Sequence, residues 1–132
     1  MKALLFIIFI SIMAITKQQT YFQYKLLVFE GSDWCANCHR LEKNILSDSL
    51  FINQLGKNSI EVERIDFPQR KKLSKNIQSY NRAIAEKYEF DGVFPTLLLI
   101  KKNDDSFQKI AYQNQSVEEF LKLIQSKLEN SK

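Results

Sequence analysis

Short apolar runs predict the strands of this chain. Residues 25–29 form a run that is rich in strand formers and too short for a helix, and residues 96–100 form another. Residues 60–67 alternate apolar and polar side chains in their first half, which predicts a further strand that Pro68 ends. After a polar turn, residues 107–112 complete a hairpin with the run at 96–100. We therefore expect four strands.

Apolar residues spaced three and four positions apart predict the helices. The pattern holds over residues 35–46, and a short helical turn follows that Gly56 closes. Residues 72–88 carry a clear amphipathic pattern. Its stripe consists of Leu73, Ile77, Tyr80, Ile84 and Tyr88. Ser116 and Glu119 form a capping box before a final helix. The stripe of that helix consists of Val117, Phe120, Leu121, Ile124 and Leu128.

The order of these elements predicts the fold class. It is strand, helix, strand, helix, strand, strand, helix, and a strand–helix–strand unit implies a right-handed crossover between parallel strands. The terminal hairpin adds an antiparallel edge. We therefore expect an α/β protein whose mixed sheet of about four strands carries helices on both faces. Neither an internal repeat nor a linker divides residues 25–130, so this region is expected to form one domain.

Composition excludes several classes of protein. With 45% hydrophobic and 26% charged residues, the chain is globular rather than disordered. Its 3 glycines and 2 prolines are too few for a many-stranded β-sandwich, and the glycine motifs of dinucleotide and phosphate sites do not occur. A formal net charge of +4, with only short basic clusters, does not predict a nucleic-acid partner.

The N-terminal residues have the pattern of a targeting segment. Lys2 precedes an apolar run over residues 3–15, and polar residues follow. As a helix this run is about 20 Å long, whereas a membrane-spanning helix needs about 30 Å. We therefore interpret residues 1–16 as a secretory signal peptide and residues 17–24 as a linker. Because the cleavage pattern at residues 14–16 is poor, an uncleaved anchor stays open. The domain would be periplasmic, either free or anchored facing the periplasm.

The 2 cysteines carry the candidate chemistry. Cys35 and Cys38 lie where a strand gives way to a helix, and residues three apart on a helix share a face, so their sulfurs can meet. The start of a helix favours negative charge, which we expect to lower the pKa of the Cys35 thiol. Cys38 lies one turn deeper. We therefore predict that Cys35 is the attacking nucleophile and that Cys38 resolves the mixed disulfide.

Three other roles for these cysteines compete with redox catalysis. A structural disulfide across four residues would remove only about 2 kcal/mol of unfolded-state entropy, less than a longer loop would. A zinc site would have Cys35, Cys38 and His39 but no fourth cysteine or histidine. The same residues fit the C-x-x-C-H pattern of c-type haem attachment, yet the methionines that could complete the haem ligands both lie within residues 1–16. We therefore expect no cofactor and no metal.

Two motifs resemble those of the thioredoxin superfamily. Residues 34–38 (Trp-Cys-Ala-Asn-Cys), which follow an apolar strand, resemble its active site, and residues 93–96 (Val-Phe-Pro-Thr) look like its cis-proline loop. Over residues 25–130 the chain is similar to the small exported thioredoxin-like proteins of bacteria. The resemblance implies a thioredoxin fold and thiol–disulfide exchange that needs no cofactor beyond the cysteines.

The resemblance also implies which residues meet the substrate. Phe94 and Pro95 would present backbone groups to an extended client, and Trp34 would pack beside the sulfur and shield it from water. Many thioredoxins carry a buried acid at the position that is Phe29 here. The adjacent Glu30 is a candidate base, but strand alternation points it to the opposite face, and a solvated strand-end glutamate is the simpler interpretation.

His39 is the second candidate modulator of the cysteines. It lies four residues after Cys35, and in its protonated form it could stabilise the thiolate. An exposed histidine on the helix surface is the simpler interpretation.

Together these features predict an exported thiol–disulfide oxidoreductase that acts as a monomer. Its partners would be the thiols and disulfides of client proteins and a redox partner that we expect in the membrane. The alternative is a non-catalytic module of the same fold that binds peptides as a chaperone does. The direction of electron flow depends on the reduction potential, which the sequence does not determine.

Overall fold

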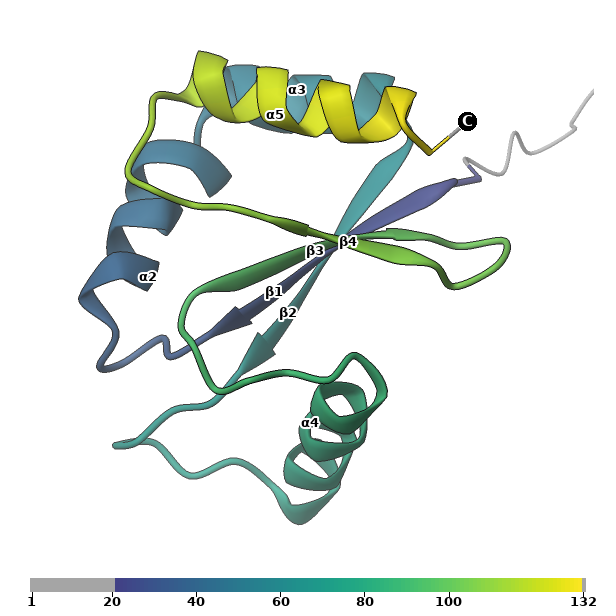
Figure 1. Cartoon of the computed structure of the whole chain (residues 1–132). Helices are drawn as coiled ribbons and strands as arrows, with labels where there is room; N and C mark the ends of the chain where they lie inside the picture. Colours follow the sequence, from purple (N-terminus) through teal and green to yellow (C-terminus); the bar gives the residue numbers. More distant parts are fainter. Residues whose placement is uncertain (1–20, 132) are drawn as a thin grey trace, which may run out of the picture.

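The computed structural model describes residues 21–131, in which a four-stranded sheet carries helices on both sides (Figure 1). In chain order the elements are β1 (Tyr24–Glu30), α2 (Ala36–Leu41), the π-helical segment η1 (Glu42–Leu46), α3 (Ser49–Lys57), β2 (Ile60–Asp66), α4 (Lys75–Lys87), β3 (Thr96–Lys101), β4 (Phe107–Ile110) and α5 (Val117–Glu129). The predicted signal peptide or anchor, residues 1–16, lies outside the described residues. No helix in the described part of the chain has the length and apolar character needed to cross a bilayer.

The strands follow the order β2-β1-β3-β4 across the sheet. β1 pairs in parallel with β2 and antiparallel with β3, and β3 and β4 form an antiparallel hairpin. The predicted parallel pair and terminal hairpin are therefore confirmed. Because β1 and β3 are the central strands, helices cover both of their faces, and this explains why their sequences are continuous apolar runs rather than alternating ones.

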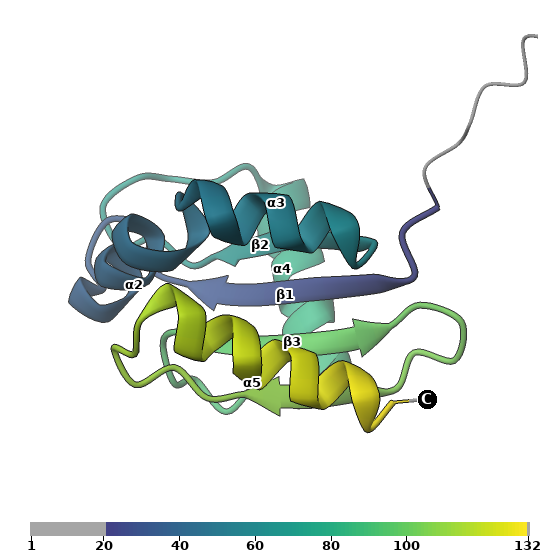
Figure 2. The same cartoon turned by 90° about the horizontal axis from the view of Figure 1, so that it is seen from above.

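One face of the sheet is covered by α2, η1, α3 and α5. α3 and α5 lie side by side across the strands (Figure 2). The core on this side is largely aliphatic and consists of Leu26, Val28, Leu97 and Leu99 from the central strands with Leu41, Ile45, Leu46, Phe51, Leu55, Ile60, Ile110, Phe120, Ile124 and Leu128. The predicted capping box is present, since the Ser116 hydroxyl accepts from the Glu119 N–H and the Glu119 carboxylate accepts from the Ser116 N–H.

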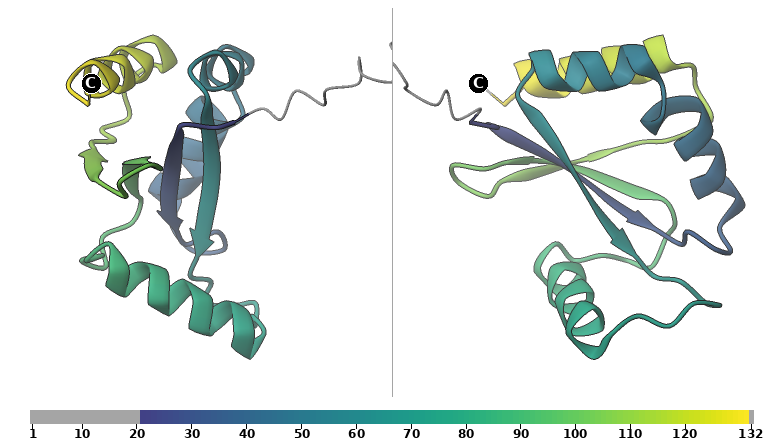
Figure 3. Two further views of the ribbon diagram at one scale, coloured as in Figure 1. Left: turned by 90° about the vertical axis from the view of Figure 1, so that its right-hand side faces the viewer. Right: turned by 180° about the vertical axis from the view of Figure 1, so that it is seen from behind.

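The opposite face is covered by α4, which runs crosswise to α3 and α5 (Figures 1 and 3). The core here is smaller and consists of Leu27, Phe29, Ile65, Tyr88, Leu98 and Ile100. Four rings, Phe29, Phe67, Phe90 and Phe94, form an aromatic cluster on this side. Phe29 and Phe90 stack with ring centroids 4.3 Å apart, and the Phe67 and Phe94 centroids are 5.8 Å apart. The cluster joins the sheet to the loops on either side of α4.

The predicted amphipathic helix before β3 is shorter and less buried than its sequence pattern indicates. α4 begins later than predicted, because the Ser74 hydroxyl caps its first turn by accepting from the Ile77 N–H. Within the predicted apolar stripe, Ile77 is 48% exposed and Tyr80 is 50% exposed. The buried residue of α4 is instead Asn81, whose side-chain amide donates to the Asp66 carbonyl at 2.8 Å. α4 therefore leaves part of its side of the sheet open.

Three further details differ from the sequence pattern. Gly56 lies inside α3 rather than closing it, because the helix continues and is capped by Asn58. β4 ends at Ile110, before the predicted boundary. The predicted helix over residues 35–46 is present, but its second half is the π-helical segment η1. Spacing of apolar residues does not distinguish these variants of the helix, because all of them keep one face toward the core.

Candidate functional site

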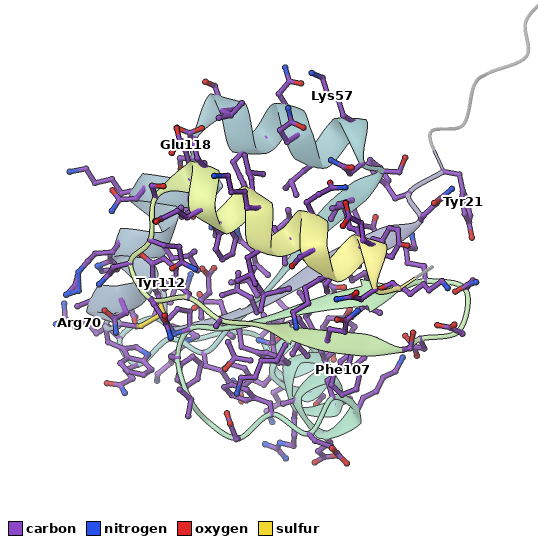
Figure 4. All side chains as sticks on the ribbon, turned by 45° about the horizontal axis from the view of Figure 1, so that its top comes forward. Tyr21, Lys57, Arg70, Phe107, Tyr112 and Glu118 are labelled. Atoms are coloured by element: carbon purple, nitrogen blue, oxygen red, sulfur yellow. A yellow bond between two sulfur atoms is a disulfide. The ribbon has the colours of Figure 1, made fainter. Side chains whose placement is uncertain are left out.

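The turn between β1 and α2 brings the two cysteines together. Cys35 is the N-cap residue of α2, and its N–H donates to the Gly31 carbonyl at 2.9 Å. Cys38 follows one turn later and forms a disulfide with Cys35, with Cα atoms 5.2 Å apart. The Cys35 sulfur also accepts a hydrogen bond from the Cys38 N–H at 3.1 Å. The disulfide lies at the end of the molecule that carries Arg70, whereas Tyr21 marks the other end (Figure 4).

Both cysteines are nearly enclosed in this disulfide form. Cys35 is 6% exposed and Cys38 is 3% exposed. The pair can store two electrons by opening to a dithiol and release them by closing again. The assignment of Cys35 as the attacking sulfur and Cys38 as the resolving sulfur stays a prediction.

The loop before β3 packs against the cysteine turn through aromatic rings. The Phe94–Pro95 peptide bond is cis. The Phe94 ring lies edge-on to the Trp34 indole, with centroids 5.1 Å apart. The Thr96 hydroxyl donates to the Val93 carbonyl at 2.8 Å and so ties the loop to the first residue of β3. Within residues 21–131 the N–H and C=O groups of Phe94 make no hydrogen bond. The two motifs that the sequence separates by more than fifty residues therefore meet in space.

Trp34 joins the cysteine turn to the aromatic cluster. Its indole N–H donates to the Phe67 carbonyl at 2.8 Å, and its side chain is 37% exposed. The indole rests on Gly31, where an added Cβ atom would lie 2.7 Å from the ring atom Cζ2. Glycine is needed at this position because the ring approaches the backbone so closely. The predicted shielding of the sulfur by Trp34 stays a prediction.

Asp33 holds the segment after β2 against the cysteine turn, a role that sequence reasoning missed. Its carboxylate accepts the backbone N–H groups of Gln69, Arg70 and Lys71 at distances of 2.9, 2.8 and 3.0 Å. The Gln69 N–H, together with those of its two neighbours, holds the pKa of this carboxyl below its ordinary value of 3.8. The Asp33 carboxylate thus satisfies three backbone N–H groups that lie outside any helix or strand and have no partner there.

Asp66 forms a second link between the same two segments and was also missed. Its carboxylate accepts from the Ser32 N–H at 2.8 Å and from the Ser32 hydroxyl at 2.6 Å, and the Lys71 ammonium lies 2.9 Å away. Burial raises the pKa of Asp66, but these donors outweigh burial and hold the pKa below its ordinary value of 3.8. The carboxylates of Asp33 and Asp66 thus hold the segment after β2 against the cysteine turn.

Glu30 is buried, which corrects the interpretation of a solvated glutamate at the strand end. Its exposed fraction is 7%, and Arg64 Nη1 lies 3.8 Å from the carboxylate. Arg64 is also paired at 2.5 Å with Glu42, at the C-terminal end of α2. Burial raises the pKa of Glu30, and Arg64 opposes this rise only in part. Strand alternation correctly pointed Glu30 away from Phe29, but it carried no information about the neighbours that cover the carboxylate.

His39 is exposed, as the simpler sequence interpretation predicted. Its Nε2 atom lies 2.7 Å from the Ser32 carbonyl, which can only accept, so this nitrogen carries the proton. The ring therefore braces the turn before Cys35. In the described part of the chain, no three His, Cys, Asp or Glu side chains gather closely enough to hold a metal ion.

A helix that starts at a CxxC disulfide, beside a cis-proline loop and on a sheet of this topology, is the arrangement of a thioredoxin-like fold. The chain has the thioredoxin fold. Comparison with solved structures supports the fold. The chain superposes on the DsbH oxidoreductase with a TM-score of 0.72 and 23% identity, over 82% of this chain and 74% of that one. A thioredoxin from Thermus thermophilus superposes with a TM-score of 0.52 and 17% identity, over 79% and 73% of the two chains.

Comparison with characterised sequences points to particular relatives. No protein-family model matches the chain. The chain is similar to the disulfide bond reductase DsbH of Chlamydia pneumoniae, with 30% identity over 87 residues, which cover 66% of this chain and 51% of the relative. It is also similar to the thioredoxin-related protein DsbJ of the same organism, with 25% identity over 85 residues, which cover 64% of this chain and 24% of the relative. The chain thus spans about half the length of the first relative and about a quarter of the second.

Proposed function

We propose that the protein is an exported thiol–disulfide oxidoreductase that exchanges disulfides with protein clients through Cys35 and Cys38. The observation that carries this proposal is the Cys35–Cys38 disulfide at the start of α2, beside the cis-proline loop. The similarity to a relative named a disulfide bond reductase favours the reducing direction. A redox partner, which we place in the membrane, would then return two electrons to the disulfide.

The reducing cycle needs no group beyond the two cysteines. The Cys35 thiolate attacks one sulfur of a client disulfide, and a mixed disulfide forms while the second client sulfur leaves and takes up a proton. Cys38 then loses its proton and attacks the Cys35 sulfur. This step breaks the mixed disulfide, releases the second client thiol and restores the Cys35–Cys38 disulfide that the structure contains. Counted from the dithiol form, in which Cys35 gives up one proton before the attack and Cys38 gives up the other, the client gains two electrons and two protons and the protein loses them.

The geometry around Cys35 supports its role as the attacking sulfur. The sulfur accepts the Cys38 N–H, one of the backbone donors at the start of α2 that have no partner within the helix. A negative sulfur accepts such a bond more strongly than a neutral one, so the contact favours the thiolate. Cys38 is the more buried of the two, which suits a sulfur that meets only its partner and not the client.

The client would approach along the loop before β3. The Phe94 N–H and C=O groups are free of other partners within residues 21–131, and an extended client segment can pair with both as an added strand does. Trp34 lies edge-on to the Phe94 ring and forms the neighbouring surface. Backbone pairing of this kind tolerates many client sequences, because the side chains do not decide it.

We also propose that Glu30 takes part in proton transfer from Cys38. Glu30 follows Leu26 and Val28 along β1 at alternate positions, and these residues pack beneath α2, the helix that carries Cys38. Burial raises the pKa of Glu30, so the carboxyl can take up and release a proton closer to neutral pH than an ordinary glutamate does. Arg64 beside it would steady the charged form.

Reduction of insulin tests the proposed function. Wild-type protein, supplied with dithiothreitol, should speed the precipitation of reduced insulin chains, and Cys35→Ser should lose this activity entirely. A binding module of the same fold would give equal, negligible rates for both proteins. A covalent Soret band in protein purified from an exporting host would instead establish haem attachment. Equilibration in glutathione buffers then gives the direction, since a potential near that of thioredoxin defines a reductant.

Export is tested separately by a reporter. Residues 1–24 fused to alkaline phosphatase should give active enzyme in the periplasm, because this enzyme is active only in an oxidising compartment. Replacement of two apolar residues of the run at 3–15 by aspartate should abolish this activity. An inactive fusion with the natural segment would contradict export while leaving the redox proposal intact.

A further inference from the structure

A groove lies on the α4 side of the sheet, next to the redox site and outside the machinery described above. It has a volume of about 610 Å³ and runs between α4 and the segment after β2. Its apolar lining includes Phe67, Leu73, Ala85 and Phe90. Figure 1 shows the segment between β2 and α4 extending beneath the start of α2. Lys71 of this segment lines the groove and its N–H donates to Asp33, so one wall of the groove reaches the cysteine turn.

The groove is continuous with the surface that the client disulfide would meet. Phe67 lines the groove, and its carbonyl accepts the Trp34 indole N–H. Phe90 also lines it, and its ring lies edge-on to Phe94 with centroids 5.0 Å apart. A polypeptide whose disulfide lies beside Trp34 and Phe94 therefore has this groove as the next surface along its path.

The wall next to the cysteine turn is fixed before any ligand arrives. Asp33 accepts three successive backbone N–H groups from this segment, and Asp66 holds both Ser32 and Lys71. These bonds hold a stretch without helix or strand in one conformation. A wall that is already ordered costs a ligand little conformational entropy, which favours recognition over simple exposure of a loop.

A polar side chain in the groove has an oxygen that is free to bind a ligand. Asn81 lines the groove and is 5% exposed. Its amide N–H donates to the Asp66 carbonyl, but within residues 21–131 its side-chain oxygen accepts no hydrogen bond. This oxygen is accessible rather than sealed from solvent, and the N–H of an extended peptide backbone is a donor that it can accept. A polypeptide offers this oxygen a donor, whereas a purely apolar ligand does not.

The charges along the groove favour an acidic side chain on the ligand. Lys72 and Arg82 both line it, and within the described residues neither lies within ion-pair distance of a carboxylate. Glu86 and Glu89 line the groove as well, so the ligand would carry its acidic residue beside Lys72 and Arg82 rather than along its whole length.

We propose that this groove binds an extended, acidic segment of the client polypeptide that flanks the disulfide to be exchanged. The segment places apolar side chains against Phe67 and Phe90, a backbone N–H on the Asn81 oxygen, and a carboxylate beside Lys72 and Arg82. This inference rests on the proposed function, because it assigns the groove to the client of the same redox site. It adds a choice between clients to a site whose backbone pairing alone discriminates little.

The test compares two disulfide-linked peptides that differ only in the charges flanking the cystine, glutamates in one and lysines in the other. Wild-type protein should reduce the glutamate peptide with a kcat/KM about tenfold higher, a difference of about 1.4 kcal/mol. The double variant Lys72→Glu/Arg82→Glu should lose or reverse the preference. The matched control is Lys57→Glu/Lys122→Glu, which changes the net charge equally at two exposed lysines of α3 and α5. It should keep the preference.

Two further measurements separate the groove from the chemistry. Hydroxyethyl disulfide, which is neutral and too small to reach the groove, should be reduced at the same rate by all three proteins. Peptides with serine in place of cysteine should bind the wild type by calorimetry, the glutamate peptide more tightly, and the binding should weaken at high salt. An unchanged peptide preference in Lys72→Glu/Arg82→Glu, or equal binding of both serine peptides, would overturn the proposal that the groove binds an acidic client segment. Failure to reduce hydroxyethyl disulfide would overturn the proposed function alone.

Discussion

The sheet face beneath α3 and α5 is closed, whereas the face beneath α4 is only partly covered. The closed face holds a continuous aliphatic core in which Phe51 and Phe120 are fully buried. The open face holds an aromatic cluster, an α4 with exposed Ile77 and Tyr80, and the groove that leads to the redox turn. The difference indicates that the two faces have different roles. The closed face supplies most of the stability, and the open face supplies the surfaces that meet a partner.

The matched substitutions Ile124→Ala on α5 and Ile77→Ala on α4 test this division with the largest expected difference. Ile124 is 3% exposed, so its truncation should cost about 2–5 kcal/mol through lost burial and an unfilled cavity. Ile77 is 48% exposed, and its truncation should change the free energy of unfolding by about 0.5 kcal/mol or less. Urea unfolding midpoints measure both. Equal losses at the two positions would show that α4 is packed as tightly as α5.

The substitution Gly31→Ala tests the contact by which Trp34 joins the cysteine turn to the aromatic cluster on the α4 face. The new Cβ atom would overlap the Trp34 indole, so the ring must move and its hydrogen bond to the Phe67 carbonyl should break, at a cost of about 1 kcal/mol. Trp34 is the only tryptophan in the chain, so its fluorescence reports on this site alone. The emission should shift to longer wavelength. Unchanged emission would mean that the turn can shift around a ring that stays in place.

Two neighbouring carboxylates should give the smallest effects, with opposite dependence on pH. Glu30 and Asp66 are paired positions of β1 and β2. Burial raises the pKa of Glu30, so the folded protein keeps this proton longer than the unfolded chain does. Stability should therefore fall as pH rises from the ordinary value of 4.5 through the folded value, and Glu30→Gln should remove this fall.

Asp66 should behave in the opposite way. Burial raises the pKa of Asp66, but the Ser32 and Lys71 donors lower it by more than burial raises it, so the net pKa lies below 3.8. Its contribution to stability is present above pH 3.8 and lost as pH falls through the folded pKa, and Asp66→Asn should remove this loss. Urea midpoints across acidic pH for the two variants measure both slopes. Parallel curves for wild type and both variants would contradict the assigned environments.

The central strands and the redox turn could be predicted from the sequence because their causes are local. A run such as residues 96–100 is apolar throughout because helices cover both faces of the strand, and a cysteine at the start of a helix is visible in the spacing alone. The helix N-cap at Ser116 is equally local, since its hydrogen bonds join residues three apart.

The contacts that surround the site could not be predicted, because their partners are distant in sequence. Asp33 binds backbone groups at positions 69–71, and backbone N–H groups carry no sequence signature. The pattern of α4 was misleading for a related reason. Apolar spacing marks Ile77 as a core position, but how far a helix is buried depends on the neighbours that the fold supplies, and here α4 stands alone on its face.

The central claim is that Cys35 attacks a client disulfide and Cys38 completes the exchange. Its most direct measurement is the mass of the protein after reaction of each reduced single-cysteine variant with a disulfide-linked peptide. Cys38→Ser should accumulate a mixed disulfide with one half of the peptide on Cys35, faster at neutral pH than an ordinary thiol reacts, while Cys35→Ser should form little adduct. An adduct that forms equally on either cysteine, or on neither, would contradict the account.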